Sequence, residues 1–320
     1  MFLTPEIIAI FILNTLFLVF SFFAFIISIK IVRSWDINST SSSQYKLEKR
    51  AILAATIIKY IFILKIPLFL FFIFTSDKIS AVLTGAMCAA GVVNSVDFGM
   101  WLVVFKIINL FIFGFWLALH AADMRDEKLS FTKLKFYIFI PAFFLLVAEI
   151  LYEVLFFSSL DITRIVSCCG AIFSATSNSS ISFVFDLPQS LTVVAFYLSF
   201  LLLILGWFLK KELLFLCANI IFIIVSLLSL ILFFGTYIYE LPTHRCPFCF
   251  LQKDYYFIGY LLYTTLFIGI LSGVNGSILT MIKPTHSQSF YKTSIIFSSI
   301  YVAIVSAYPI IFYIKNGVWL

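Results

Sequence analysis

The chain alternates between long apolar runs and short polar segments. Eight of the runs reach or exceed the roughly 20 residues that an α-helix needs to cross the hydrocarbon layer of a bilayer. This pattern predicts an all-α membrane protein, a polytopic bundle of about eight transmembrane helices. The predicted spans are residues 6–32, 51–75, 101–122, 136–157, 189–209, 213–236, 256–281 and 294–315. They fill most of the sequence, so residues 1–320 are expected to form a single integral membrane domain.

The composition supports a membrane protein and leaves no room for a separate soluble domain. Hydrophobic residues make up 63% of the chain and charged residues 11%, whereas a water-soluble domain needs a charged surface. The first apolar run has no positive residues ahead of it and no small-residue cleavage site after it. We therefore expect a first transmembrane helix there and not a removable signal peptide.

The lysine and arginine residues indicate how the helices are oriented. The segments after the first, third, fifth and seventh spans hold twelve of them: Arg33, Lys46, Lys49, Arg50, Arg125, Lys128, Lys133, Lys135, Lys210, Lys211, Lys283 and Lys292. The other loops and the C-terminal end hold only Lys78, Arg164, Arg245, Lys253 and Lys315. The positive-inside rule places the first group in the cytoplasm and both termini on the outer side of a cell inner (plasma) membrane. Because the basic residues sit in short loops, the net charge of +6 does not indicate a nucleic-acid partner.

Five of the six cysteines fall in predicted outer loops, where disulfides are permitted. They are Cys88, the vicinal Cys168 and Cys169, and the pair Cys246 and Cys249. Five is an odd number, so at least one of them is free, liganded or bonded to another chain. The sixth, Cys217, lies near the cytoplasmic end of the sixth span and is expected to be a small packing residue.

Cys246 and Cys249 form a Cys-x-x-Cys pair just ahead of the seventh span. Such a pair can close and reopen a disulfide, hold a soft metal, or form a plain structural bond. The thiolate is the reactive form, and cations or a helix N-terminus lower the pKa of a thiol. His244 and Arg245 precede the pair, Lys253 follows it, and a helix beginning near Cys249 would direct its positive end at the sulfurs. These features favour a redox-active pair, while the metal and structural alternatives stay open.

His244 and the cysteine pair also form half of a soft-metal site. Cys168 or Cys169 would complete four ligands for zinc or copper(I). This favours an alternative function, a metal-handling membrane protein such as a copper or haem-assembly factor. A further alternative is a transporter whose cysteines only tie its outer loops together.

The stretch Cys246-Pro-Phe-Cys249-Phe-Leu-Gln252-Lys253, followed by a membrane span, resembles the first outer-loop motif of the DsbB-type disulfide-forming thiol:quinone oxidoreductases. The family passes electrons from an extracytoplasmic thiol protein to a quinone. The resemblance implies that Cys249 faces the quinone and that Cys246 exchanges with a second disulfide. It also places Lys253 where the family has a quinone-contacting arginine.

The resemblance covers about ten residues and one span, and the rest of the chain differs from the family pattern. The family has about four spans, whereas eight are predicted here. Its second cysteine pair follows the motif, whereas Cys88, Cys168 and Cys169 precede the motif in this sequence. We expect these three cysteines to supply the exchange partner of Cys246.

Four charged residues are predicted to lie within the outer half of the bilayer. Lys65 is in the second span, Lys106 in the third, and Glu149 and Glu153 in the fourth. Glu149 and Glu153 are four residues apart and share one helix face. Since charge inside a membrane is expensive, we expect a buried ionic cluster in which the lysines neutralise the carboxylates. Its depth suits a quinone headgroup or a proton path, although the cluster could equally hold the helices together.

The features together favour a membrane thiol-disulfide oxidoreductase that couples outer-face cysteines to a lipid-soluble quinone. Its predicted catalytic residues are Cys246, Cys249, Cys88, Cys168 and Cys169, and its predicted quinone-binding residues are Lys253, Lys65, Lys106, Glu149 and Glu153. The expected partner is a soluble extracytoplasmic thiol protein, besides membrane lipid. The direction of electron flow stays open.

Overall fold

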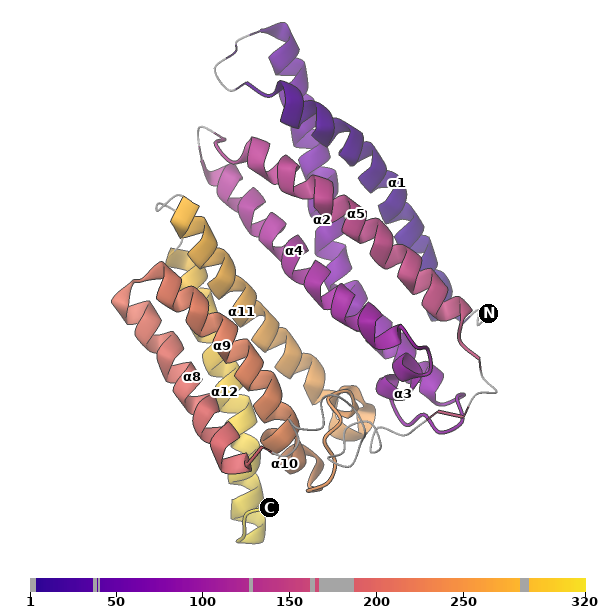
Figure 1. Ribbon diagram of the computed structural model, residues 1–320, viewed down its shortest axis with the longest axis vertical. Coiled ribbons are helices and arrows are strands. Elements are labelled where there is room, and N and C mark those ends of the chain that lie inside the picture. Colours follow the sequence, from indigo (N-terminus) through magenta and orange to yellow (C-terminus); the bar gives the residue numbers. More distant parts are fainter. Residues whose placement is uncertain are drawn as a thin grey trace. The chain divides into compact units, whose positions relative to one another are not determined.

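The computed structural model describes residues 4–36, 39, 41–126, 129–161, 165–166, 187–282 and 288–320. Over these residues the chain contains eight helices that are long and apolar enough to cross a membrane, and it contains no β-strand. The predicted all-α membrane protein of about eight spans is thereby confirmed (Figure 1). The spans are α1 (Pro5–Ser34), α2 (Ser42–Ser80), α4 (Gly99–Arg125), α5 (Thr132–Ser158), α8 (Gln189–Leu209), the helical stretch Glu212–Tyr239, α11 (Ile258–Ile282) and α12 (Gln288–Asn316).

The sixth span is not a uniform helix. It consists of α9 (Glu212–Ser229), a π-helical segment (Leu230–Phe234) and α10 (Gly235–Tyr239). The shorter elements are α3 (Ala89–Asn94) and two 3₁₀ turns, η2 (Cys249–Leu251) and η3 (Lys253–Tyr255). A π-helical segment inside a longer helix often occurs at a functional site, and this one lies just ahead of the loop that carries the cysteine pair.

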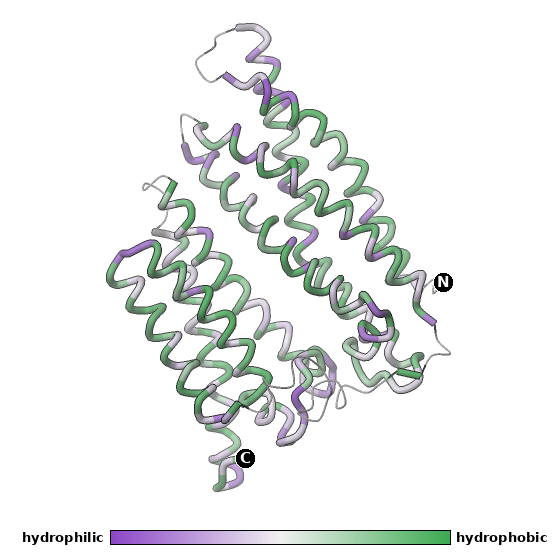
Figure 2. The backbone as a smooth tube through the Cα atoms, viewed as in Figure 1, coloured by the Kyte–Doolittle hydropathy of each residue, from purple (hydrophilic) through white to green (hydrophobic). Residues whose placement is uncertain are grey.

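The helices extend beyond the spans predicted from hydropathy, most of all in α2. This helix begins at Ser42, nine residues before the predicted span, and its first turns carry Lys46, Lys49 and Arg50. The apolar run marks only the part of a helix that suits hydrocarbon, whereas lysine, glutamate and glutamine continue a helix readily into water. Figure 2 shows the same division, with hydrophobic residues along the spans and hydrophilic ones gathered toward the loops and helix ends.

The chain divides into two compact units. Unit 1 comprises Met1–Ser76 and Val93–Ile162, and unit 2 comprises Asp77–Val92 and Thr163–Leu320. The division falls within α2 and within α3, so the last turn of α2 belongs to unit 2. The expected single integral domain remains a prediction.

Unit 1 is built around α5, which packs against both α1 and α4. Aromatic rings fill its interior: Phe62 of α2 stacks on Phe113 of α4 at 4.3 Å and meets Trp116 edge-on at 5.4 Å. The turn between α4 and α5 is fixed by buried Asp123, which accepts hydrogen bonds from the Phe131 amide and the Lys135 ammonium. These contacts hold α4 and α5 in one register and so position the charged residues on them.

Unit 2 contains a bundle of α8, α9, α11 and α12, in which α11 packs closely on both α9 and α12. Small residues allow the close approach: a Cβ on Gly273 would lie only 2.2 Å from the side-chain oxygen of Asn219 on α9. Around Phe196 the core is aromatic, with the rings of Phe222 and Tyr301 near it. This packing fixes the α10 end of the sixth span beside the start of α11, where the cysteines lie.

Candidate functional site: a three-cysteine cluster

The sulfur atoms of Cys88, Cys246 and Cys249 lie together in unit 2. All three lie within 4.8 Å of one another, and the sulfurs of Cys88 and Cys246 are 3.7 Å apart. That is a thiol–thiol contact, since a disulfide bond is about 2.05 Å long. All three side chains are buried. The structure therefore brings together three of the five cysteines predicted to be catalytic, from segments 158 residues apart in the sequence.

The Cys88 loop is held in place at the end of α2. Gly85 has a φ of +92°, and a Cβ there would lie 2.3 Å from the carbonyl oxygen of Val166. Only glycine fits this close approach. The Val166 amide donates to the carbonyl oxygen of Thr84. A short part of the fourth loop therefore passes directly beside the segment that carries Cys88.

Asp77 and Gln252 join the two cysteine-bearing loops. The Gln252 side-chain amide donates to Asp77 Oδ1 at 3.0 Å and to the Met87 carbonyl oxygen at 2.8 Å. Asp77 Oδ1 also accepts from the amide of Ala89 at 3.2 Å. Met87 and Ala89 flank Cys88, and Gln252 lies three residues after Cys249. These bonds hold the two segments in the register that gives sulfur contact.

Two tyrosine hydroxyls hold the backbone of the cysteine pair by hydrogen bonds. The Tyr239 hydroxyl donates to the carbonyl oxygen of Cys246, and the Tyr263 hydroxyl donates to that of Pro247 at 2.5 Å. Tyr239 also stacks on Phe250, with ring centroids 4.6 Å apart. Phe250 packs against Gly259, where a Cβ would lie 2.8 Å from the Phe250 side chain. The residue after Cys249 is thus locked between α10 and α11.

No α-helix begins near Cys249, so the condition stated for a helix dipole acting at the sulfurs is not met. Cys249 starts the short turn η2, and α11 begins nine residues later at Ile258. Gln252 is extended between the two turns, and Tyr256 and Phe257 have positive φ angles. A continuous helix would turn Gln252 away from Asp77 and Met87, so the hydrogen bonds of this side chain favour the broken conformation. The macrodipole of α11 therefore does not act directly on the sulfurs.

His244 lies beside the cluster as a neutral base. Its ring meets Tyr239 edge-on at 4.3 Å, and its Nε2 atom is buried without a hydrogen-bond partner among the described residues. Burial lowers the pKa of His244 below its ordinary value, against the opposing effect of the nearby Cys88 sulfur. A neutral imidazole can accept a thiol proton or bind a metal. Lys253 is exposed at the start of η3, and its contact with quinone remains a prediction.

The pKa of His244 makes the stability of the protein depend on pH. The unfolded chain protonates this histidine near its ordinary pKa, and the folded protein does so only at lower pH, so stability falls as the pH drops through that window. We expect the melting temperature in detergent to fall more steeply between pH 7 and 5 for the wild type than for His244→Gln. Above pH 7.5 the two profiles should run parallel, since His244 is then neutral in both states. Parallel profiles over the whole range would contradict this pKa.

The link between Asp77 and Gln252 gives a second expectation. Gln252→Ala removes a hydrogen bond to a carboxylate and one to a carbonyl, worth about 1–3 kcal/mol together. The equilibrium constant between the conformation with Cys88 and Cys246 in contact and the separated conformation should then fall about tenfold, since 1.4 kcal/mol corresponds to a factor of ten. The measurement is the rate at which a mild oxidant links Cys88 to Cys246, quantified by peptide mass mapping. The exposed Gln189→Ala on α8 is the matched control and should leave the rate unchanged; an unchanged rate in Gln252→Ala would contradict the positioning role.

The predicted ionic cluster in unit 1 is confirmed. Lys65 and Lys106 lie 3.1 and 3.0 Å from Glu149 Oε1, and Lys106 lies 2.9 Å from Glu153 Oε2. All four side chains are buried. The two positive and two negative charges balance, which makes their burial tolerable. Whether the cluster binds a quinone remains a prediction.

Two asparagines complete this cluster. Asn14 of α1 accepts from Lys65 at 3.0 Å and donates to Glu153 at 2.9 Å, and Asn109 donates to Glu149 at 2.6 Å. One carboxylate oxygen, Oε1 of Glu153, is buried without a hydrogen-bond partner in the described part of the chain. This oxygen can therefore accept one further hydrogen bond from a donor that is brought to it.

Three cysteine predictions have other outcomes. Cys168 and Cys169 lie outside the described residues, so their predicted roles stay predictions. Cys217 is exposed on α9, so the expectation that it packs in the interior was wrong. Its position shows that an apolar sequence around a cysteine does not distinguish a lipid-facing side from a packed one, because both are equally hydrophobic in a membrane helix.

No protein-family model, curated protein or solved structure matches this chain. The fold and the sites defined above therefore carry the functional argument alone. They define a multi-pass helical membrane protein with a buried cluster of three cysteines.

Proposed function

We propose that this protein is a membrane thiol-disulfide oxidoreductase that passes electrons between outer-face cysteines and a lipid-soluble quinone. The observation that carries the proposal is the contact of Cys88 with the Cys-x-x-Cys pair. A relay needs a third sulfur within reach of one member of a redox pair, and the Cys88–Cys246 separation of 3.7 Å meets that need. A plain structural pair would not need a third buried thiol beside it.

In the proposed cycle, a disulfide between Cys88 and Cys168 or Cys169 first accepts two electrons from a dithiol partner, which becomes a disulfide. The Cys88 thiolate then attacks Cys246 of the Cys246–Cys249 disulfide and releases Cys249 as a thiolate. The second outer cysteine attacks Cys88, restores the outer disulfide and leaves Cys246 and Cys249 reduced. Closing their bond again delivers two electrons and two protons to quinone. The balance is one quinol and one partner disulfide per quinone and two thiols.

Burial of the sulfurs explains why an outer cysteine is included. A soluble thiol protein cannot reach side chains as buried as Cys88 and Cys246. The Val166–Thr84 hydrogen bond brings the chain to the Cys88 loop two residues before Cys168. We therefore assign Cys168 or Cys169 the exchange with the partner, on the outer side of a cell inner membrane with both termini outside, as the positive-inside rule predicts.

The quinone side of the proposal rests on the surface that follows the pair. Lys253 is exposed near the exposed aromatic residues Tyr256 and Phe257, close to the start of α11. An ammonium next to exposed aromatic rings at the rim of a membrane span suits a planar apolar headgroup with carbonyl oxygens. Reverse flow, which would deliver reductant to the outer compartment, uses the same parts.

The direct test is quinone-linked thiol oxidation by the purified protein in liposomes. A short-chain quinone and a reduced dithiol peptide are supplied, and both products are counted. The proposal expects one quinone reduced per two thiols oxidised, or the same ratio in reverse when quinol and a disulfide peptide are supplied. Absence of protein-dependent exchange in both directions would refute it.

A second candidate function, metal handling, is favoured by one specific observation. In tetrahedral zinc sites with Zn–S distances of about 2.3 Å, neighbouring sulfurs lie about 3.8 Å apart, close to the Cys88–Cys246 separation. His244 Nε2 is a further buried atom without a partner among the described residues. The metal content of the protein purified under reducing conditions separates the two candidates. Stoichiometric zinc or copper that is lost in Cys246→Ser would favour metal handling over the redox relay.

A further inference from the structure

A basic cavity lies at the opposite end of unit 2 from the cysteine cluster. Its volume is about 410 Å³, and it lies where the turn from α8 to α9 meets the end of α11 and the start of α12. Gly259 and Thr280, at the two ends of α11, are separated by 21 residues, or about 30 Å of helix. Four of its lining residues are charged: Lys210, Lys211, Glu212 and Lys292. Three positive charges against one negative make it attractive to anions.

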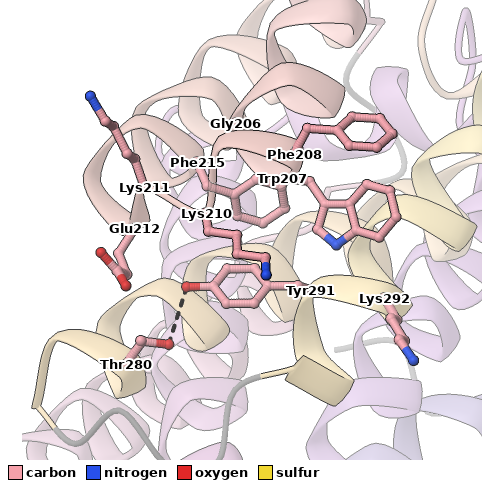
Figure 3. Close-up of a pocket in the computed structure, with 10 residues that line it drawn as sticks. All are labelled: Gly206, Trp207, Phe208, Lys210, Lys211, Glu212, Phe215, Thr280, Tyr291 and Lys292. Atoms are coloured by element: carbon pink, nitrogen blue, oxygen red, sulfur yellow. Dashed lines mark hydrogen bonds between the residues drawn. The ribbon is translucent and has the colours of Figure 1, made fainter.

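The arrangement of side chains indicates which lining residues can contact a ligand (Figure 3). The ammonium of Lys210 extends toward the ring of Tyr291, and the indole of Trp207 lies beside it. Lys211 and Lys292 extend away from these side chains on opposite sides. The indole N–H of Trp207 has no hydrogen-bond partner among the described residues. Thr280 donates its hydroxyl proton to the Gly276 carbonyl, so the 3.1 Å bond between Thr280 and Tyr291 uses the proton of the tyrosine. The cavity therefore offers the Trp207 N–H and the Lys210 ammonium as donors to a ligand, and the flexible side chain of Lys292 also lines it.

The surface beside the cavity is apolar. Phe208 also lines it and is 67% exposed, and the neighbouring Leu205, Leu209 and Leu213 are exposed as well. Exposed leucine and phenylalanine on a membrane-spanning helix face acyl chains. The cavity thus combines hydrogen-bond donors for a phosphate with an adjoining surface for hydrocarbon. A soluble phosphate would need only the donors, whereas a phospholipid would use both.

We propose that this cavity binds the headgroup of an anionic phospholipid, with the phosphate at Lys210, Lys292 and Trp207 and an acyl chain along Phe208 and Leu205. The positive-inside rule places this end of unit 2 at the cytoplasmic leaflet, where anionic lipids attract juxtamembrane lysines. The proposal does not depend on the thiol chemistry.

The test is native mass spectrometry of the purified protein with phosphatidylglycerol or with phosphatidylcholine of the same acyl chains. The wild type should retain one phosphatidylglycerol in preference to phosphatidylcholine. Lys210→Gln combined with Lys292→Gln should weaken that binding about 30-fold, since each lysine near anionic lipid contributes about fivefold. Lys46→Gln combined with Lys49→Gln removes two lysines from the start of α2 and should leave binding unchanged.

Two further arms make the outcome decisive. Phosphatidylglycerol with brominated acyl chains should quench Trp207 fluorescence, taken as the difference between wild type and Trp207→Phe. Inorganic phosphate in millimolar excess should not displace the lipid. Displacement by phosphate would identify a soluble-anion site, and equal loss of lipid in both lysine pairs would show only non-specific surface charge; either result would overturn the proposal.

Discussion

Replacing Cys249 by serine is expected to abolish quinone-linked thiol oxidation, a loss on the order of 10³-fold or more. Without the Cys249 sulfur the inner disulfide cannot form, so no route remains from Cys246 to quinone. Cys246 lies 3.7 Å from Cys88, so its thiolate can still attack Cys88 of the proposed outer disulfide, which forms a Cys88–Cys246 bond and releases Cys168 or Cys169 as a thiol. The variant should therefore accumulate a Cys88–Cys246 disulfide, which peptide mapping without reductant would detect. Quinone reduction is followed by absorbance.

The matched control is Cys217→Ser, because Cys217 is exposed on α9 and lies in a different part of unit 2. It should oxidise thiols at the wild-type rate. Cys246→Ser should also be inactive but should not accumulate a bond to Cys88. Wild-type turnover in Cys249→Ser would contradict the relay, and inactivity without the trapped disulfide would contradict the assigned order of attack.

The buried ionic cluster of unit 1 should give the largest effect on stability. Glu149→Gln leaves the ammoniums of Lys65 and Lys106 with a single carboxylate between them. A buried charge without its partner destabilises a protein by about 3–5 kcal/mol. We expect a decrease of that size in the free energy of unfolding, measured by denaturant titration in detergent micelles.

The double variant Lys65→Met/Glu149→Gln separates charge balance from simple loss of contacts. It restores the charge balance, because one buried lysine, Lys106, and one buried carboxylate, Glu153, remain and lie 2.9 Å apart. It should be more stable than Glu149→Gln alone by at least about 1 kcal/mol, a coupling that is expected of residues in one network. Additive losses would contradict the charge-balance account. If the double variant regains stability and still cannot reduce quinone, the cluster also has a functional role.

The spans and the charged cluster could be predicted from the sequence because the membrane imposes strict rules. A lysine or glutamate inside an apolar run has to find an opposite charge, so the positions of Lys65, Lys106, Glu149 and Glu153 within their spans are enough to pair them. The asparagines were missed, although Asn14 is a polar residue in an otherwise apolar span and could have been found by the same rule. Asn109 lies one helical turn from Lys106, which was an equally usable clue.

The contacts around the cysteines could not have been derived in the same way. The positions of the cysteines in predicted outer loops indicated that they share one side of the membrane. That Cys88 is the one that contacts Cys246 depends on the hydrogen bond between Asp77 and Gln252, which are 175 residues apart in sequence. Neither of these residues carries a pattern that separates it from an ordinary loop residue. The absence of an α-helix at Cys249 likewise follows from tertiary hydrogen bonds that override local propensity.

The proposed relay depends most on the ability of Cys88, Cys246 and Cys249 to exchange bonds with one another. The most direct test is thiol trapping of the wild-type protein in its membrane, with peptide mapping before and after quinone is added. The relay predicts that quinone raises the fraction of Cys246 bonded to Cys249, that adding a dithiol lowers this fraction, and that a Cys88–Cys246 bond is trapped between these states. Bond patterns that never include Cys88 with Cys246, and that do not respond to quinone or dithiol, would contradict it.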